Sequence, residues 1–219
     1  MQGRTCATRR FAWVVMPDDF LILLARVLGI AGVMLLAASA VLGVLLASRA
    51  AQRLRLLKGR TFRTHRLLSV LGAGLLLAHP LPAVLARKTT GVSLAAVFVP
   101  FAAEKLAFNI AFGAVALDVL LVVLASSLLI KRLPRKAWRR LHYGAYAVLV
   151  LGLYHDLLIP DDFGPDARYA PVDPLAFDKV LVELAIVGVL LASAWRVNAA
   201  ARRQTGPRGG RGRTKGPGA

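Results

Sequence analysis

The stretch HRLLSVLGAGLLLAH at residues 65–79 is almost entirely apolar and carries a histidine at each end, His65 and His79. A second stretch, HYGAYAVLVLGLYH at 142–155, has the same form, with His142 and His155 at its ends. The chain has no other histidine. At about 1.5 Å of rise per residue, each pair is roughly 20 Å apart along a helix, a large part of the hydrocarbon thickness of a bilayer. Both stretches therefore predict a membrane-crossing helix with a histidine near either end.

The composition also indicates an integral membrane protein. Of the 219 residues 57% are hydrophobic and 18% are charged, and the mean hydropathy is +0.61, whereas soluble domains average about 45–50% apolar and about 25% charged residues. A disordered chain, a disulfide scaffold and an ordinary soluble enzyme are poor fits to these values. A helix needs about 20 mostly apolar residues to cross a bilayer. The stretches that meet this requirement are 20–48, 67–86, 106–130, 141–159 and 175–197.

The shorter apolar piece at 92–103 ends near a proline and cannot span the bilayer, so we expect it to be interfacial or re-entrant. The predicted fold is accordingly all-α, an integral membrane helical bundle of about five transmembrane helices. We divide the chain into an N-terminal segment at 1–19, the membrane domain at 20–197 and a basic cytoplasmic tail at 198–219. The tail is rich in Gly, Pro and Arg, and this composition predicts disorder.

The net charge of +18 is concentrated in three segments. Residues 49–66, 131–140 and 196–219 contain no acid and hold 20 of the 29 Lys and Arg residues. A five-helix bundle places all three on one side, which the positive-inside rule assigns to the cytoplasm. The N-terminus is then outside and the C-terminus inside, in the cell membrane. We interpret the charge as a marker of topology next to membrane lipids and expect no nucleic acid as partner.

The N-terminal basic residues Arg4, Arg9 and Arg10 lie outside under this topology, which disagrees with the positive-inside rule. They also fit the start of a signal peptide with a cleavage site after Ala40, although the apolar run continues past that point. Both interpretations leave the later four helices in place. The lone Cys6 forms no disulfide within the chain and no cysteine-based metal site.

The four histidines fall into two predicted layers. Both histidine helices run in the same direction, so His65 lies at the depth of His142, and His79 at the depth of His155. Two neutral imidazoles in one layer suit the two axial positions of a haem b. Zinc fits less well because its ligands cluster within a few ångström, and interfacial or hydrogen-bonding histidines are the structural alternative. A spacing of thirteen residues turns a straight helix by about 140° from its starting face, so the fourth helix has to twist, bulge or meet its two haems from different sides.

The histidine spacing resembles the ferric reductase-like transmembrane domain family. The matching features are His65-x13-His79, His142-x12-His155 and the run SLLIKRLPRKAWRRLHYGAYAVLVLGLYH at 127–155, and the resemblance covers roughly residues 20–197. It implies an inner haem on His65 and His142, an outer haem on His79 and His155, and electron flow from a cytoplasmic flavin to an acceptor outside. Larger family members have six helices and continue into FAD- and NADPH-binding domains, which this sequence does not contain. We therefore expect a separate flavin-containing donor protein and an external electron acceptor.

Three arginines are candidate partners of haem propionates. Arg26 lies near the outer end of the first helix and pairs with an outer propionate or snorkels to headgroups. Arg63 and Arg66 flank the first histidine and either hold inner propionates or act only in topology. We predict no catalytic residue.

Two acidic residues lie within the apolar stretches. Asp118 has three alternative roles: it relays a proton, accepts a hydrogen bond from a ligating histidine, or forms a hydrogen bond with a neighbouring helix. Glu183 has the same alternatives. The predicted function is transmembrane electron transfer, with reduction of an external ferric chelate as the enzymatic variant. The alternative from another class is a non-redox membrane anchor or small transporter with incidental histidines.

Overall fold

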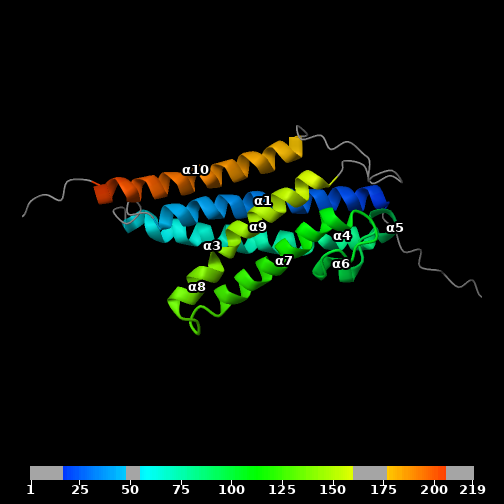
Figure 1. Ribbon diagram of the computed structural model, residues 1–219, viewed down its shortest axis with the longest axis horizontal. Coiled ribbons are helices and arrows are strands. Elements are labelled where there is room, and N and C mark those ends of the chain that lie inside the picture. Colours follow the sequence, from blue (N-terminus) through cyan, green and yellow to red (C-terminus); the bar gives the residue numbers. More distant parts are fainter. Residues whose placement is uncertain (1–16, 48–54, 160–176, 206–219) are drawn as a thin grey trace, which may run out of the picture.

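The computed structural model describes residues 17–47, 55–159 and 177–205, and within these ranges all regular structure is helical (Figure 1). The long helices are α1 (Asp18–Leu46), α3 (Arg55–Ala78), α7 (Ala107–Leu128), α9 (Gly144–Leu158) and α10 (Phe177–Thr205). The shorter ones are α4 (Pro80–Leu85), α5 (Arg87–Thr90), α6 (Leu94–Phe98) and α8 (Arg135–His142). The all-helical fold predicted from the sequence is confirmed for this part of the chain.

Four of the described helices are long and apolar enough to cross a bilayer: Asp18–Leu46, Gly59–Leu85, Ala107–Leu128 and Lys179–Ala199. Large apolar side chains on their outer surfaces face away from the bundle, among them Leu71, Leu128 and Leu191, which are 49%, 85% and 66% exposed. A soluble protein rarely exposes extended apolar patches. Lipid is the solvent that suits these surfaces, and the helices fit an integral membrane protein.

The fourth predicted crossing, 141–159, is not one helix. Helix α8 ends at His142, Tyr143 forms a turn, and α9 begins at Gly144 with only 15 residues. A Cβ added at Gly144 would lie 3.1 Å from Cγ2 of Val123 on α7, so glycine lets the start of α9 approach α7 closely. A straight helix would have directed the two histidines to different faces. Tyr143 between α8 and α9 keeps helical backbone angles, φ −66° and ψ −16°, and each histidine nevertheless lies beside its partner. Against the expected count of about five transmembrane helices, four of the described helices are long and apolar enough to cross, with α8 and α9 in the place of the fifth.

The helices alternate in direction (Figure 1). Helices α1, α7 and α10 run one way, and α3 and α9 run the other way. The end of α1, the start of α3, the α7–α8 connection and the end of α10 therefore lie toward the same end of the bundle. These are the places that adjoin or contain the three basic segments, so the predicted gathering of positive charge at one end is confirmed for their described residues.

The last helix continues further than the sequence analysis placed it. Helix α10 runs to Thr205, so the prediction that disorder starts at residue 198 is wrong for residues 198–205. These residues add about two helical turns beyond the apolar segment. Residues 206–219 and the N-terminal segment up to residue 16 lie outside the described part, as do Arg4, Arg9 and Arg10.

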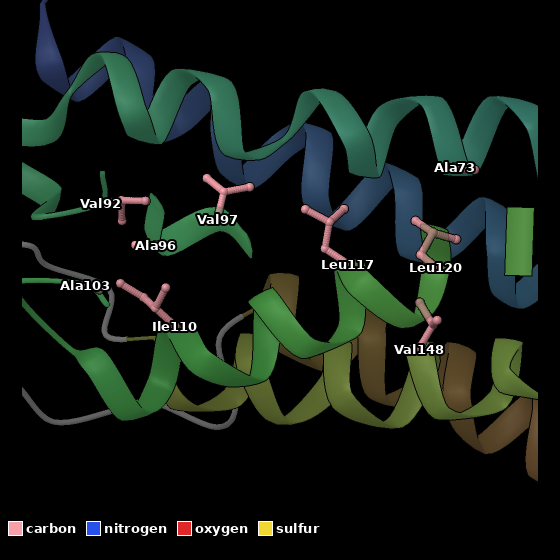
Figure 2. Close-up of a cluster of buried hydrophobic side chains, with 9 residues drawn as sticks. All are labelled: Ala73, Val92, Ala96, Val97, Ala103, Ile110, Leu117, Leu120 and Val148. Carbon is pink, nitrogen blue, oxygen red and sulfur yellow. The ribbon is translucent and has the colours of Figure 1, made fainter. Parts of the chain in front are cut away.

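Segment 92–103 does not cross the bundle. Within it α6 spans five residues, and Ala96 is fully buried while Leu94 is 68% exposed. The preceding Gly91 adopts φ +71°, and a Cβ there would lie 2.8 Å from the backbone nitrogen of Lys105. The segment lies toward the end of the bundle opposite the basic segments (Figure 1). Its buried residues form a cluster with residues of α3, α7 and α9 (Figure 2). The cluster comprises Ala73, Val92, Ala96, Val97, Ala103, Ile110, Leu117, Leu120 and Val148.

Helices α1 and α3 cross at a pair of glycines. A Cβ added at Gly72 would lie 3.0 Å from the carbonyl oxygen of Gly32, and a Cβ at Gly32 would lie 2.7 Å from Cγ of Leu76. Small residues let helix backbones approach closely in membranes. The close approach brings backbone carbonyls of α1 within reach of side chains on α3.

We expect Gly72→Ala to destabilise the protein because its methyl group meets the backbone of α1, which cannot move aside as a flexible side chain does. Overpacking of this kind costs about 1–3 kcal/mol. The measurement is thermal unfolding in detergent, with Gly74→Ala as the control, because a Cβ at Gly74 has no neighbour within 4 Å. Equal midpoints for the two variants would contradict a tight α1–α3 contact.

Candidate functional site

The four histidines form two pairs across the bundle. The ring centroids of His65 and His142 are 6.4 Å apart with an interplanar angle of 76°, and those of His79 and His155 are 6.1 Å apart at 82°. In each pair one histidine comes from α3 or its C-terminal end and the other from α8 or α9. The two predicted layers are confirmed, while metal ligation by these residues stays a prediction.

The separation within each pair suits one metal ion between two imidazoles. A metal–imidazole bond is about 2 Å long, and the ligating nitrogen lies roughly 1 Å from its ring centre, so two imidazoles on opposite sides of one ion have centroids about 6 Å apart. Both measured separations agree with this value. Within the described residues no group of three or more His, Cys, Asp or Glu side chains could hold a metal ion. A metal ion between the two imidazoles of a pair would therefore have two protein ligands, and its other positions would fall to a bound group.

Three of the four rings are oriented by backbone carbonyls. A carbonyl oxygen only accepts hydrogen bonds, so each of these rings carries its proton on Nδ1 and, when neutral, leaves the Nε2 lone pair available for a metal. Two of the carbonyls belong to α1 and one to α7. The bonds are His65 to Ser39 O at 2.9 Å, His79 to Ala25 O at 2.7 Å and His155 to Asn109 O at 3.0 Å.

A glycine lies four residues after each of these carbonyls. In an α-helix the side chain of residue i+4 leans back toward the carbonyl of residue i, so a glycine there leaves space for an imidazole to reach that oxygen. An added Cβ would crowd the bound ring in all three places. It would lie 3.3 Å from His65 Cε1 at Gly43, 2.9 Å from His79 Nδ1 at Gly29 and 2.9 Å from His155 Nδ1 at Gly113.

His142 is held differently. Its Nδ1 is buried without a hydrogen-bond partner in the described structure, and its ring stacks on Trp138 with centroids 5.0 Å apart and an interplanar angle of 20°. Its partner His65 is better fixed, because Ser39 Oγ also lies 2.9 Å from that Nδ1 and 2.6 Å from Ser69 Oγ. The pair His65–His142, here called the inner pair, thus has one ring oriented by a carbonyl. The pair His79–His155, the outer pair, has two.

A mostly apolar cavity surrounds the outer pair. His79 and His155 line it together with small residues such as Ala83, Gly113 and Gly152. Seven members of the cluster in Figure 2 also line it. These are Val92, Ala96, Val97, Ile110, Leu117, Leu120 and Val148. Small and apolar side chains thus surround the two imidazoles.

Among the predicted propionate partners, only Arg26 lines this cavity. Arg63 and Arg66 are exposed and lie outside its lining. Lys179, in the first turn of α10, is a cavity residue to which the sequence pattern assigns no role. It is 1% exposed and lines the same cavity.

The two acidic candidates are half-buried and lie outside the cavity lining. Neither Asp118 nor Glu183 contacts the histidine nitrogens, whose Nδ1 partners are backbone carbonyls and the Ser39 hydroxyl. The carboxylate that does line the cavity is Asp156, the residue after His155. A hydrogen bond between either acidic residue and a histidine is therefore absent from the described structure.

Comparison of the chain with protein-family models, with curated proteins and with solved structures finds no match. The resemblance to the ferric reductase-like family therefore stays a prediction carried by the histidine spacing.

Proposed function

We propose that the chain is a membrane cytochrome that holds two b haems, one on His65 and His142 and one on His79 and His155, and transfers electrons across the bilayer. The observation that carries this proposal is the pair of facing imidazoles at 6.1 and 6.4 Å in two layers. The layers are roughly 20 Å apart along α3 by helix geometry. Two sites stacked along the bundle axis are what a path for electrons across a membrane needs.

The donor set supports haem over other metal groups. Structural zinc takes four protein ligands, whereas each layer here offers two imidazoles. A six-coordinate haem b takes its other four nitrogens from its own porphyrin and needs only two axial ligands. Bound haem iron supplies a one-electron carrier, because it alternates between the ferric and ferrous states.

The chain's own groups prepare the imidazoles for this role. Carbonyl acceptors on three rings hold the tautomer in which Nε2 is free, and such partners raise ligand basicity. Incidental histidines have no reason to share one arrangement of acceptor carbonyl and glycine at i+4. The shared arrangement at His65, His79 and His155 thus supports a common ligating role over the non-redox anchor or transporter.

The proposed topology has five crossings, with α8 and α9 as the fourth. The apolar part of α8 and α9, residues 141–158, is about 27 Å long at 1.5 Å per residue, close to the thickness of the hydrocarbon core. The basic end of the bundle lies in the cytoplasm by the positive-inside rule, and the N-terminus lies outside. A separate flavin-containing protein donates electrons at the basic end, near His65 and His142, and the external acceptor takes them beside the outer pair.

The test of this function is an optical spectrum of the purified protein, reduced minus oxidised, with haem extracted and counted per chain. We expect a b-type spectrum and two non-covalent haems per chain, because each layer has a complete axial pair. Protein purified from cells supplied with a haem precursor controls for incomplete loading. Absence of a haem signal from the protein of these precursor-supplied cells would contradict the proposal. One haem per chain would restrict the proposal to a single layer.

A further inference from the structure

Helix α10 packs into the bundle along a stripe that begins with a charged residue. Lys179, Val182, Ile186 and Val189 recur at helical spacing and are 1%, 1%, 6% and 2% exposed. The three apolar members pack against α1 and α9 in one buried cluster. Lys179 therefore occupies a position where the helix pattern calls for an apolar side chain.

A buried ammonium in a membrane protein is costly, and intramembrane charges are usually functional. Lys179 lines the outer cavity together with Arg26 of α1 and Asp156 of α9. Both α1 and α10 begin at the same end of the bundle (Figure 1), and each contributes one of these cations to the cavity lining.

We propose that Arg26 and Lys179 form a carboxylate-binding site in the outer cavity, and that the propionate groups of the outer haem occupy it. This inference rests on the proposed function. A guanidinium binds a carboxylate in a bidentate way, and an ammonium binds it as a point charge. An apolar cavity with cations from two helices matches the chemistry of haem, which has an apolar ring and two acidic side chains.

The site gives α10 a role beyond packing. No histidine comes from α10, which contacts the cavity through Lys179 and Val182. Held between Arg26 and Lys179, the carboxylates connect α1 to α10 across the cavity. We therefore expect loss of Lys179 to loosen the outer haem and to leave the inner haem in place.

The experiment compares two haems in the same loaded protein, natural haem and its dimethyl ester, in which both carboxylates are blocked. The rate at which the outer haem leaves for an excess of haem-free myoglobin is measured for wild type, Lys179→Gln and the exposed control Lys88→Gln. With natural haem we expect Lys179→Gln to lose outer haem about tenfold faster than wild type, the size of one charge-assisted hydrogen bond. With the ester we expect the two rates to agree. Lys88→Gln should match wild type throughout.

Several outcomes separate the possibilities. A tenfold effect that persists with the ester would overturn the carboxylate site and give Lys179 a purely structural role, such as neutralising Asp156. Loss of natural haem from Lys179→Gln at the wild-type rate would also overturn the carboxylate site. The proposed function would stand in that case, because haem would still be bound through His79 and His155. A chain that binds no haem would overturn both. If Lys179→Gln does not accumulate, the two haems are compared in wild-type protein alone. The dimethyl ester must then leave the outer site about tenfold faster than natural haem.

Discussion

Replacing either His79 or His155 with alanine will reduce the haem content from two per chain to one. In the proposed arrangement each pair supplies both axial ligands of its haem, and no other described His, Cys or Met lines the cavity to replace a lost imidazole. The haem of the other layer stays bound, because its ligands lie roughly 20 Å away along the helices. The measurement is the ratio of extracted haem to protein, with Tyr154→Phe as a control next to His155 on α9.

The four single variants also test the pairing itself. His79→Ala and His155→Ala must leave the same residual spectrum, that of the inner haem. His65→Ala and His142→Ala must leave the other one. If His79→Ala and His142→Ala shared a residual spectrum instead, the ligand sets would not follow the layers. Retention of both haems in every variant would show that the histidine pairs are not ligands.

Substituting alanine for Gly113 or Gly29 will weaken the outer haem site although neither residue touches a metal. The added methyl group would lie 2.9 Å from His155 Nδ1 or His79 Nδ1, a distance that real Cβ atoms essentially never show. The ring must move and give up its bond to the carbonyl four residues earlier. Overpacking costs about 1–3 kcal/mol, or roughly 5- to 150-fold in haem retention.

The glycine prediction has graded controls. Gly43→Ala should weaken the inner site less, because its Cβ would lie 3.3 Å from His65 Cε1. Gly74→Ala and Gly188→Ala have no neighbour within 4 Å and should retain both haems. They should also be slightly more stable, by about 1 kcal/mol, because alanine favours the helix. If Gly113→Ala retained as much outer haem as Gly74→Ala, the inference that glycine leaves space for the imidazole ring would be contradicted.

Much of the candidate site could be predicted from histidine positions and charge. Helix rise converts the spacing of His65 and His79 into a depth difference, and the basic segments determine which ends of the helices lie together. The prediction that His65 faces His142, and His79 faces His155, follows from these two facts and agrees with the ring separations. The propionate role of Arg26 remains a prediction, supported by its place in the cavity lining.

Other parts of the site could not be read from the pattern. A straight fourth helix would direct His142 and His155 to different faces, yet both lie beside their partners, with the turn at Tyr143 between them. Glycines are common in membrane helices, so the sequence pattern alone does not reveal a role for those at 29, 43 and 113. Their role appears once the carbonyl of Asn109 or Ala25 is seen to accept a hydrogen bond from an imidazole.

Hydropathy, charge placement and helix rise were enough to predict the helical membrane class, the gathering of positive charge at one end and the relative depth of the histidines, because these are properties of single segments. The packing of the helices sets which carbonyl orients each of three rings, where glycine makes room for that ring, and that Lys179 lines the same cavity as Arg26. These depend on how two helices meet, and the rotation and crossing of packed helices are not encoded in the period of either helix alone.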